Sequence, residues 1–346
     1  MNTSALHPQS TQPDLLALDV GGANLKAADG SGWSQSEPFA MWREWQRLHE
    51  AIGRLLHLRP ARHLVVTMTG EIADCFSDRH AGVGHIVTAC VQAAAGLPMS
   101  FYSLSGELVS AKVAAARPLE VAAANWHALA RLAGSLQPQG QGLLLDIGST
   151  TTDIVPLTNG QPTPRGRHDW DRLSAGELVY TGIERTAVPA VVRGLPYGGH
   201  RRPISSEYFA TTRDAWLLTG GLPECPADCN TADGQPATRA AARIRLARTL
   251  LLEPEQFGDQ AAVEAAEWIV EAQARQLARS LAIVAAASSK PPQFIILSGH
   301  GSPLALRALD HLGWSVPVIS LPKVLGPAVS RAAPAHAVAL IGRGQL

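Results

Sequence analysis

The sequence is poor in cysteine, in aromatic residues and in charge. Its 346 residues include four cysteines, 5% aromatic and 17% charged residues. Four scattered cysteines are too few for a disulfide framework in a chain of this size, and no uninterrupted apolar run is long enough to span a bilayer. The 29 basic side chains balance the 29 acidic ones, and no basic stripe is interleaved with aromatics. We therefore expect neither a nucleic-acid nor a membrane partner.

The length and the hydrophobic content, in contrast, are ample. The chain can form two domains with sizeable cores, because 46% of its residues are hydrophobic. Residues 1–13 are polar, contain proline and lack an apolar signal core, so they predict a disordered lead-in to a cytoplasmic protein. Nothing in the sequence indicates the oligomeric state.

The most informative stretch is Gly142 to Leu157, GLLLDIGSTTTDIVPL. An apolar run, a small polar turn and a second apolar run predict a β-hairpin. The turn region combines Asp146, Asp153, a glycine and four hydroxyls, a content that suits phosphate and a divalent metal. The alternative interpretation is an ordinary polar hairpin in which both aspartates only form the turn.

Two further glycine turns support the first interpretation. Leu15 to Lys26, LLALDVGGANLK, repeats the same hairpin pattern around Asp19 and suggests two related halves. Ile295 to Ser302, IILSGHGS, is a third glycine turn that follows a predicted strand and precedes a predicted helix.

The order of elements predicts an α/β fold of two domains. Strands that alternate with helices favour mostly parallel sheets covered on both faces. We place the first domain at residues 14–137, which the C-terminal helix 331–346 could complete, and the second at 138–330, after the PQGQG segment. We also expect one helix over Pro118 to Leu136 and a long loop over Ile72 to Gly84.

The three glycine turns resemble the nucleotide-site motifs of the actin/hexokinase/Hsp70 (ASKHA) superfamily, whose two ribonuclease H-like domains face each other across a cleft. Further blocks resemble a hydantoinase/oxoprolinase-type family associated with tetrahydromethanopterin-linked C1 transfer. The resemblance runs from about Leu15 to about Leu340. The blocks are LDVGGANLKAA, MTGEIADCF, LLLDIGSTTTDIVPL, RLSAGELVYTGIERT, EYFATTRDAWLLTG and NTADGQPATRAAARIRLAR.

The resemblance implies a transferase of methanofuran biosynthesis with small-molecule substrates. In that reaction the phenol oxygen of a γ-glutamyltyramine attacks a furanylmethyl diphosphate, an ether forms and diphosphate leaves. The leaving group needs charge neutralisation, and Mg²⁺ is the expected cofactor. The phenol, with an ordinary pKa of about 10, needs a base.

The residues take the following expected roles. Asp19 and Asp146 are expected metal ligands, Asp153 is a further metal or turn-capping residue, and Glu71 is either the base or a helix N-cap neighbour. Lys26 either neutralises phosphate or is an exposed strand lysine. Arg165, Arg167 and His168 either bind substrate carboxylates or form an exposed loop. The remaining phosphate-binding candidates are Gly21, Gly22, Asn24, Gly148, Ser149, Thr150 and Thr151, and the candidates on the substrate or nucleotide side are Gly299, His300 and Gly301.

Two cysteine groupings do not predict metal sites. Cys225 and Cys229 are half of a zinc pattern without its second pair. Cys75, His80 and His85 match none of the usual zinc spacings. Both groups are expected to be structural or incidental.

Two other functions fit the same glycine turns. One is an ATP-dependent kinase or a hydantoinase/oxoprolinase-like hydrolase subunit, which would use ATP and need a purine slot beside Gly299 and Gly301. The other is a non-catalytic protein that binds nucleotide or phosphate. Two carboxylates at the phosphate turns favour catalysis, because a binding module does not need both.

Overall fold

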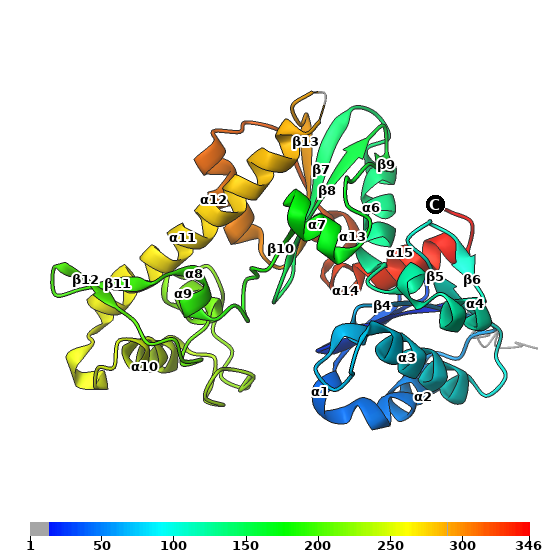
Figure 1. Ribbon diagram of the computed structural model, residues 1–346, viewed down its shortest axis with the longest axis horizontal. Coiled ribbons are helices and arrows are strands. Elements are labelled where there is room, and N and C mark those ends of the chain that lie inside the picture. Colours follow the sequence, from blue (N-terminus) through cyan, green and yellow to red (C-terminus); the bar gives the residue numbers. More distant parts are fainter. Residues whose placement is uncertain (1–13, 289) are drawn as a thin grey trace, which may run out of the picture. The chain divides into compact units, whose positions relative to one another are not determined.

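The protein divides into two compact units (Figure 1). The computed structural model describes residues 14–288 and 290–346, so the expected lead-in at residues 1–13 lies outside the described residues. Unit 1 contains the described residues up to Leu136 together with Pro322–Leu346, and unit 2 is Gln137–Leu321. The chain returns to unit 1 at Pro322, ahead of residue 331, because the helix α14 (Pro327–Arg331) packs on β3 of that unit.

Unit 1 is built on a six-stranded sheet with the order β3-β2-β1-β4-β5-β6. The strands β1 and β4 are parallel neighbours at its centre, and every residue of both is buried, as their continuous apolar sequences require. The pairs β1–β2, β2–β3 and β5–β6 are antiparallel, whereas β4–β5 is parallel. The strands are β1 Leu16–Val20, β2 Asn24–Ala28, β3 Ser34–Pro38, β4 Leu64–Met68, β5 Met99–Tyr102 and β6 Leu108–Val109.

Helices pack against this sheet through small and branched apolar side chains. The C-terminal helix α15 lies on β1, β4 and α6, and its residues Ala333 to Ala339 are all buried. A Cβ atom on Gly342 would lie 2.5 Å from Leu15 Cδ1, so glycine permits this close approach. The helices of unit 1 are α1 Met41–Glu44, η1 Trp45–Arg47, α2 Leu48–Leu58, η2 Gly70–Ile72, α3 Arg79–Ala94, α4 Ala111–Ala116, α5 Pro118–Val121, α6 Asn125–Leu136, α14 and α15 Ala333–Gly342, and α13 Leu321–Leu325 spans the boundary between the units.

Unit 2 repeats the sheet of unit 1. Its strand order is β10-β8-β7-β13-β14, and β9 pairs with β8. The pairs β10–β8 and β8–β7 are antiparallel, while β7–β13 and β13–β14 are parallel, which is the pattern of β3-β2-β1-β4-β5. The predicted relation between the two halves is therefore confirmed in their topology. The strands are β7 Gln141–Ile147, β8 Thr152–Thr158, β9 Gln161–Pro162, β10 Leu178–Val179, β13 Phe294–Gly299 and β14 Val318–Ser320.

A long insertion between β10 and β13 distinguishes unit 2 from unit 1. It contains the two-stranded sheet β11–β12 and the helix α11, which packs against α9, α12 and β11 (Figure 1). The insertion and its flanks comprise α7 Asp169–Ala175, α8 Val188–Val191, β11 Gly194–Tyr197, β12 His200–Pro203, α9 Thr212–Leu218, α10 Arg239–Thr249, η3 Pro254–Gln256, α11 Asp259–Ala286 and α12 Ser302–Leu312.

Two expected elements differ from the structure. The helix expected over Pro118 to Leu136 is broken into α5 and α6, because Ala122 is extended and Ala123 adopts a left-handed φ of 48°. Packing overrides the helix propensity of the alanines here, and the Leu104 amide bonds the Glu120 carbonyl at the break. The loop expected over Ile72 to Gly84 is short, because Asp78 caps α3 by accepting from the Ala81 amide at 2.8 Å.

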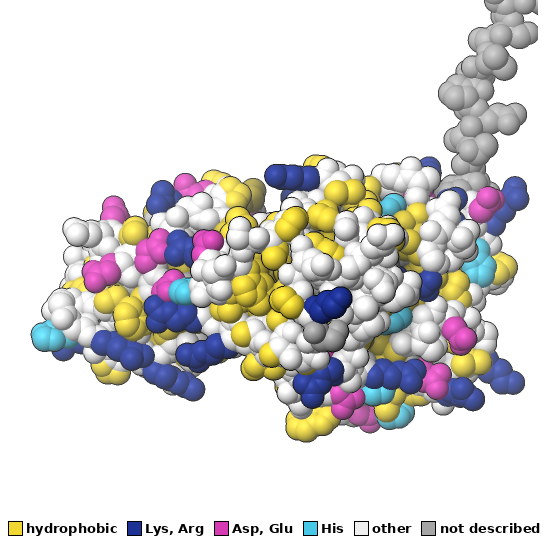
Figure 2. All heavy atoms as spheres, turned by 90° about the horizontal axis from the view of Figure 1, so that it is seen from above, with side chains coloured by type: hydrophobic (Ala, Val, Ile, Leu, Met, Phe, Trp, Pro, Cys, Tyr) yellow, Lys and Arg dark blue, Asp and Glu magenta, His cyan; other side chains and the backbone are white. Residues whose placement is uncertain are grey.

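The surface is mixed in character. Figure 2 shows side chains of both charges among hydrophobic ones on the face in view. Across residues 14–288 and 290–346, no helix is both long and apolar enough to cross a membrane.

Candidate functional site

The first hairpin places a buried carboxylate opposite a lysine. Asp19 lies near the carboxyl end of β1, directly across the antiparallel pair from Lys26. The Lys26 ammonium is 3.4 Å from Asp19 Oδ2, and the side chains are 28% and 2% exposed. The other oxygen, Asp19 Oδ1, is buried and has no hydrogen-bond partner among the described residues. A buried carboxylate oxygen of this kind needs a donor or a cation, and a ligand or metal would supply one.

The turn of this hairpin depends on close backbone approach. The Gly21 amide donates to the Asn24 carbonyl at 3.0 Å, and a Cβ atom on Gly21 would lie 2.9 Å from that oxygen. A Cβ atom on Gly70 would lie 2.9 Å from the Gly21 carbonyl oxygen. The Met41 amide bonds the Gly22 carbonyl at 2.9 Å. The turn is therefore held against the end of β4 and the start of α1.

Glu71 is fully buried, with 0% exposure, in the short helix η2. A Cβ atom on Gly82 would lie 2.0 Å from the Glu71 carbonyl oxygen, so α3 packs directly on its backbone. Glu71 thus lies in the first turn of a helix whose N-cap is Thr69, as the alternative interpretation of this residue predicts. Its assignment as the base stays a prediction.

The second hairpin places two carboxylates on one face of the sheet. Asp146 and Asp153 are direct cross-strand partners on β7 and β8. Asp153 Oδ1 accepts a hydrogen bond of 2.7 Å from the buried Arg172 guanidinium of α7. Burial raises the pKa of the Asp153 carboxyl, and Arg172 opposes that change. One oxygen of the Asp153 carboxylate is therefore engaged by Arg172.

A segment of six residues, Thr181 to Thr186, supports the tip of the second hairpin. We call it the strap. Its Ile183 amide bonds the Gly148 carbonyl at 3.1 Å, and the Glu184 and Arg185 amides bond the Ser149 carbonyl at 3.1 and 2.8 Å. The strap thereby engages two carbonyl oxygens of the turn, while Thr150 beside them stays exposed. These bonds hold the backbone of the turn in place, and phosphate binding by the turn stays a prediction.

The contact between strap and hairpin requires a glycine. A Cβ atom on Gly182 would lie 2.5 Å from the carbonyl carbon and oxygen of Ser149 and from the Thr150 amide nitrogen. The Gly182 carbonyl in turn accepts from Thr212 Oγ1 at 2.9 Å and from Gln273 Nε2 at 2.7 Å. The hairpin tip is thus linked to α9 and α11 through the strap.

The third glycine turn brings His300 to the same hairpin. Gly299 has a φ of +75°, and a Cβ atom there would lie 2.1 Å from the Ile147 carbonyl oxygen and 3.1 Å from Asp146 Oδ1. The His300 amide bonds the Ile147 carbonyl at 3.2 Å. A Cβ atom on Gly301 would lie 2.1 Å from Ile147 Cγ2. The predicted strand–glycine–helix turn is confirmed, and it lies against the second hairpin.

Glu184 of the strap pairs with His300. Glu184 Oε1 is 3.5 Å from His300 Nε2. Burial acts to raise the pKa of the Glu184 carboxyl, but His300 and Arg213 outweigh it and hold that pKa below its ordinary value. The sequence interpretation named His300 and missed Glu184. The signal was present in the quoted block RLSAGELVYTGIERT, which contains Glu184.

The charged loop before α7 has a structural role. The Glu177 carboxylate accepts from the Arg165 and Gly166 amides at 2.6 and 2.9 Å. His168 is the N-cap residue of α7, and the Arg165 and Arg167 side chains belong to exposed residues. This placement matches the exposed-loop alternative, and carboxylate binding by these three residues stays a prediction.

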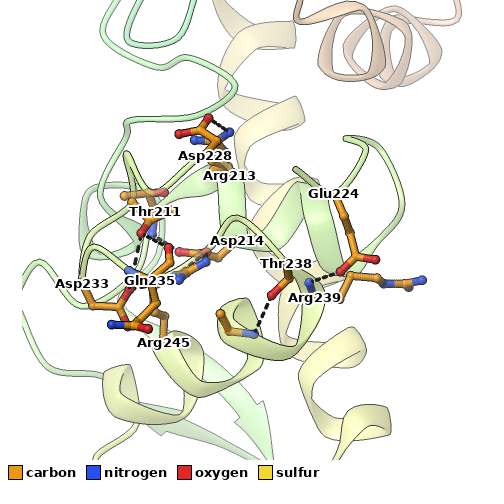
Figure 3. Close-up of polar contacts among 12 residues, drawn as sticks. Thr211, Arg213, Asp214, Glu224, Asp228, Asp233, Gln235, Thr238, Arg239 and Arg245 are labelled. Atoms are coloured by element: carbon orange, nitrogen blue, oxygen red, sulfur yellow. Dashed lines mark hydrogen bonds and ion pairs between the residues drawn. The ribbon is translucent and has the colours of Figure 1, made fainter. Parts of the chain in front are cut away.

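A buried network of arginines and aspartates organises the segment Cys225 to Thr238, which contains the NTADGQPAT block (Figure 3). Arg245 is fully buried and contacts Asp214 Oδ1 at 2.7 Å and Asp233 Oδ1 at 3.0 Å. Arg213 pairs with Asp228. Cys225 and Cys229 are exposed and free. No role was predicted for these charged residues, because their partners lie on other elements.

The donor set at the hairpins fits magnesium. Within the part of the chain that the structure describes, no group of three or more His, Cys, Asp or Glu side chains could hold a metal ion. Mg²⁺, however, is usually held by one or two carboxylates together with waters and phosphate oxygens. Each hairpin, considered by itself, suits this mode, because the first offers the buried and unpartnered Asp19 Oδ1 and the second offers the Asp146 carboxylate beside Gly299.

Comparison with known proteins shows the fold and the family. The nucleotide-free structure of an acetone carboxylase superposes with a TM-score of 0.56 at 11% identity, over 94% of this chain and 70% of that chain. It supports an actin/hexokinase-like α/β fold, as the glycine turns predict.

Two relatives carry the name (4-{4-[2-(gamma-L-glutamylamino)ethyl]phenoxymethyl}furan-2-yl)methanamine synthase. The one from Methanocaldococcus jannaschii is 28% identical over 335 residues, covering 96% of this chain and 98% of the relative. The one from Methanococcus vannielii is 30% identical over 207 residues, covering 59% of this chain and 91% of the relative. The model of the hydantoinase/oxoprolinase family matches residues 62–339. The chain therefore belongs to the hydantoinase/oxoprolinase family.

Proposed function

We propose that this protein is a methanofuran-biosynthesis synthase that joins a furanylmethyl diphosphate to the phenol of a γ-glutamyltyramine-type acceptor. The observation that carries the proposal is the match to the Methanocaldococcus jannaschii synthase, which extends over 96% of this chain and 98% of that protein. A match of this extent includes both hairpins, the strap and the insertion, and not only the turns common to the superfamily.

The hairpins suit the leaving group of this reaction. Diphosphate carries several negative charges, and the turns offer backbone amides and the hydroxyls of Ser149, Thr150 and Thr151 as donors. Lys26 lies beside Asp19 and could balance part of the charge. These groups would stabilise the diphosphate as its bond to carbon breaks.

Asp19 and Asp146 are the residues that we propose to bind Mg²⁺, directly or through water. Bound Mg²⁺ would supply further charge neutralisation for the diphosphate. Asp153 is a weaker candidate, because Arg172 holds one of its oxygens. Glu71 remains a candidate base in unit 1, where it is fully buried.

The methylene carbon is activated by the chemistry of the substrate. The furan oxygen can stabilise positive charge that develops on this carbon as diphosphate leaves. Water would capture the same carbon, so the protein must exclude it while the phenol approaches. Catalysis therefore requires positioning, charge neutralisation and removal of one proton.

The test is a direct assay of the purified protein with Mg²⁺. One reaction contains γ-glutamyltyramine and the aminomethylfuranylmethyl diphosphate, and a second contains ATP. We expect diphosphate release that depends on the tyramine and is lost in Asp146→Asn but not in Asp259→Asn, a fully exposed control with a side chain 96% exposed. Turnover of ATP without ether formation would overturn the proposal and favour the kinase alternative.

A further inference from the structure

The Glu184–His300 pair lies at the edge of the second hairpin and is positioned by the backbone on both sides. The strap residue Glu184 bonds the Ser149 carbonyl through its amide, and His300 bonds the Ile147 carbonyl. Their side chains meet at 3.5 Å, between Glu184 Oε1 and His300 Nε2. Glu184 is 28% exposed and His300 is 49% exposed, so the imidazole is accessible to a small molecule.

Charged groups surround the Glu184 carboxylate on two sides. Glu184 faces His300 and Arg213, and Asp228 lies beyond Arg213. The Asp146 carboxylate lies beside Gly299, the residue before His300. His300 and Arg213 hold the pKa of Glu184 below its ordinary value, so Glu184 is ionised at neutral pH.

An ionised carboxylate accepts a hydrogen bond and cannot donate one. Because Glu184 Oε1 faces Nε2 at 3.5 Å, a neutral His300 ring that carries its proton on Nε2 is the tautomer that suits this contact, and its lone pair is then on Nδ1. A carboxylate that fixes a histidine tautomer in this way prepares the other ring nitrogen to accept a proton.

We propose that His300 takes the proton from the attacking phenol and that Glu184 is the positioning residue that orients its ring. This inference rests on the proposed function. In the step, the phenol O–H proton moves to His300 Nδ1 and the phenol oxygen forms a bond to the furan methylene carbon. The bond from that carbon to diphosphate breaks, and its electron pair leaves with diphosphate.

The position of the pair favours this role over a structural one. A general base must reach the proton that it removes. His300 is half exposed and adjoins the phosphate-binding turn, whereas Glu71, the base expected from the sequence, is fully buried in η2. The proton acceptor and the phosphate donors of the second hairpin would then belong to one unit.

Unit 2 contains a matched control for the experiment. His311 of α12 pairs with Glu271 of α11 at 2.9 Å, and their side chains are 31% and 33% exposed. This second histidine–glutamate pair is also partly exposed, and it lies on the helices α11 and α12 outside the glycine turns. His311→Gln and Glu271→Gln therefore report what loss of a surface pair does to the fold.

The experiment measures ether formation by wild type, His300→Gln, Glu184→Gln, Glu71→Gln and the two control variants. The acceptors are γ-glutamyl derivatives of tyramine and of ring-fluorinated tyramines, whose phenols are more acidic. We expect His300→Gln to lower kcat about 100-fold or more with tyramine, with little change in KM for the diphosphate. The loss should shrink as the phenol becomes more acidic, because an ionised phenol needs no base. Added imidazole should restore part of the activity of His300→Ala, and Glu184→Gln should shift the pH profile.

Several outcomes would overturn the assignment. A His300→Gln activity equal to that of His311→Gln would do so, as would an equal loss for all phenols. A large loss in Glu71→Gln that acidic phenols rescue would assign the base to Glu71 instead. If wild type forms ether and only the His300 result fails, this inference falls and the proposed function stands. If wild type forms no ether, both fall together.

Discussion

Replacing Arg245 by methionine should destabilise unit 2 strongly. The Arg245 side chain is 0% exposed, and its Nε and Nη2 atoms both lie 2.7 Å from Asp214 Oδ1. Its Nη1 atom lies 3.0 Å from Asp233 Oδ1. Methionine fills much of the same space but leaves Asp214, 2% exposed, without its cation. Removal of one partner from a buried ion pair reduces the free energy of unfolding by about 3–5 kcal/mol.

Arg248→Met is the matched control. Arg248 contacts the same Asp233 at 2.8 Å, but its side chain is 47% exposed. Exposed ion pairs contribute about 1 kcal/mol or less. Urea unfolding of both variants, followed by tryptophan fluorescence and by limited proteolysis of residues 225–238, compares the two losses.

A double variant isolates the effect of the unpaired buried charge. Arg245→Met combined with Asp214→Asn should be more stable than Arg245→Met alone, because no buried charge remains unpaired. Equal losses in Arg245→Met and Arg248→Met would refute the reasoning, as would a double variant less stable than Arg245→Met.

Three further predictions test other parts of the molecule. Gly182→Ala should abolish ether formation, because its Cβ atom would lie 2.5 Å from the backbone of Ser149, whereas Gly53→Ala in α2, whose Cβ atom would meet nothing within 4 Å, should keep most of the activity; equal kinetics would contradict the role of the strap. Burial raises the pKa of Cys90 to about 12, so a thiol reagent should modify the exposed Cys225 and Cys229 in the native protein and Cys90 only after unfolding, as mass spectrometry can show. Burial acts to raise the pKa of the Asp29 carboxyl, but hydrogen bonds from Ser31 and Arg59 outweigh burial and hold that pKa below its ordinary value. The ionised Asp29 therefore stabilises the fold above the ordinary aspartate pKa, and this stabilisation is lost as the pH falls through the lowered pKa of the folded state. Asp29→Asn should lower the free energy of unfolding at pH 7 by about 1–3 kcal/mol, and the difference between wild type and variant should become smaller below the ordinary aspartate pKa of about 3.9. Thermal unfolding of both proteins at several pH values measures this difference, and a difference that does not change with pH would contradict the prediction.

The glycine turns and their hairpins were predictable because their determinants are local. An apolar run that ends at Asp19 or Asp146, followed by glycine and small polar residues, specifies strand, turn and strand within about a dozen positions. The repeated pattern also predicted the relation between the two halves. Their common strand order then follows from that relation.

The pairs that complete the candidate site were not predictable from local pattern. Glu184 and His300 are brought together because β13 pairs with β7 in parallel, which carries the third glycine turn to the second hairpin. Asp153 finds Arg172 through the folding of α7 onto β10. The spacing of these residues along the sequence predicts neither contact, because both contacts depend on the sheet register and on packing. The prediction of one continuous helix across Ala122 and Ala123 was wrong for the same reason, because alanine by itself favours a helix and the break depends on packing.

The position of α15 has a consequence for the order in which the two units fold during synthesis. Unit 2 is one continuous segment, Gln137–Leu321, whereas unit 1 needs α15 to cover β1 and β4. A nascent chain that has emerged only as far as Leu321 can complete unit 2 while the apolar faces of these first strands remain uncovered. The half that is synthesised first is thus the half that finishes folding last, and it is the part of the molecule most in need of a chaperone during translation.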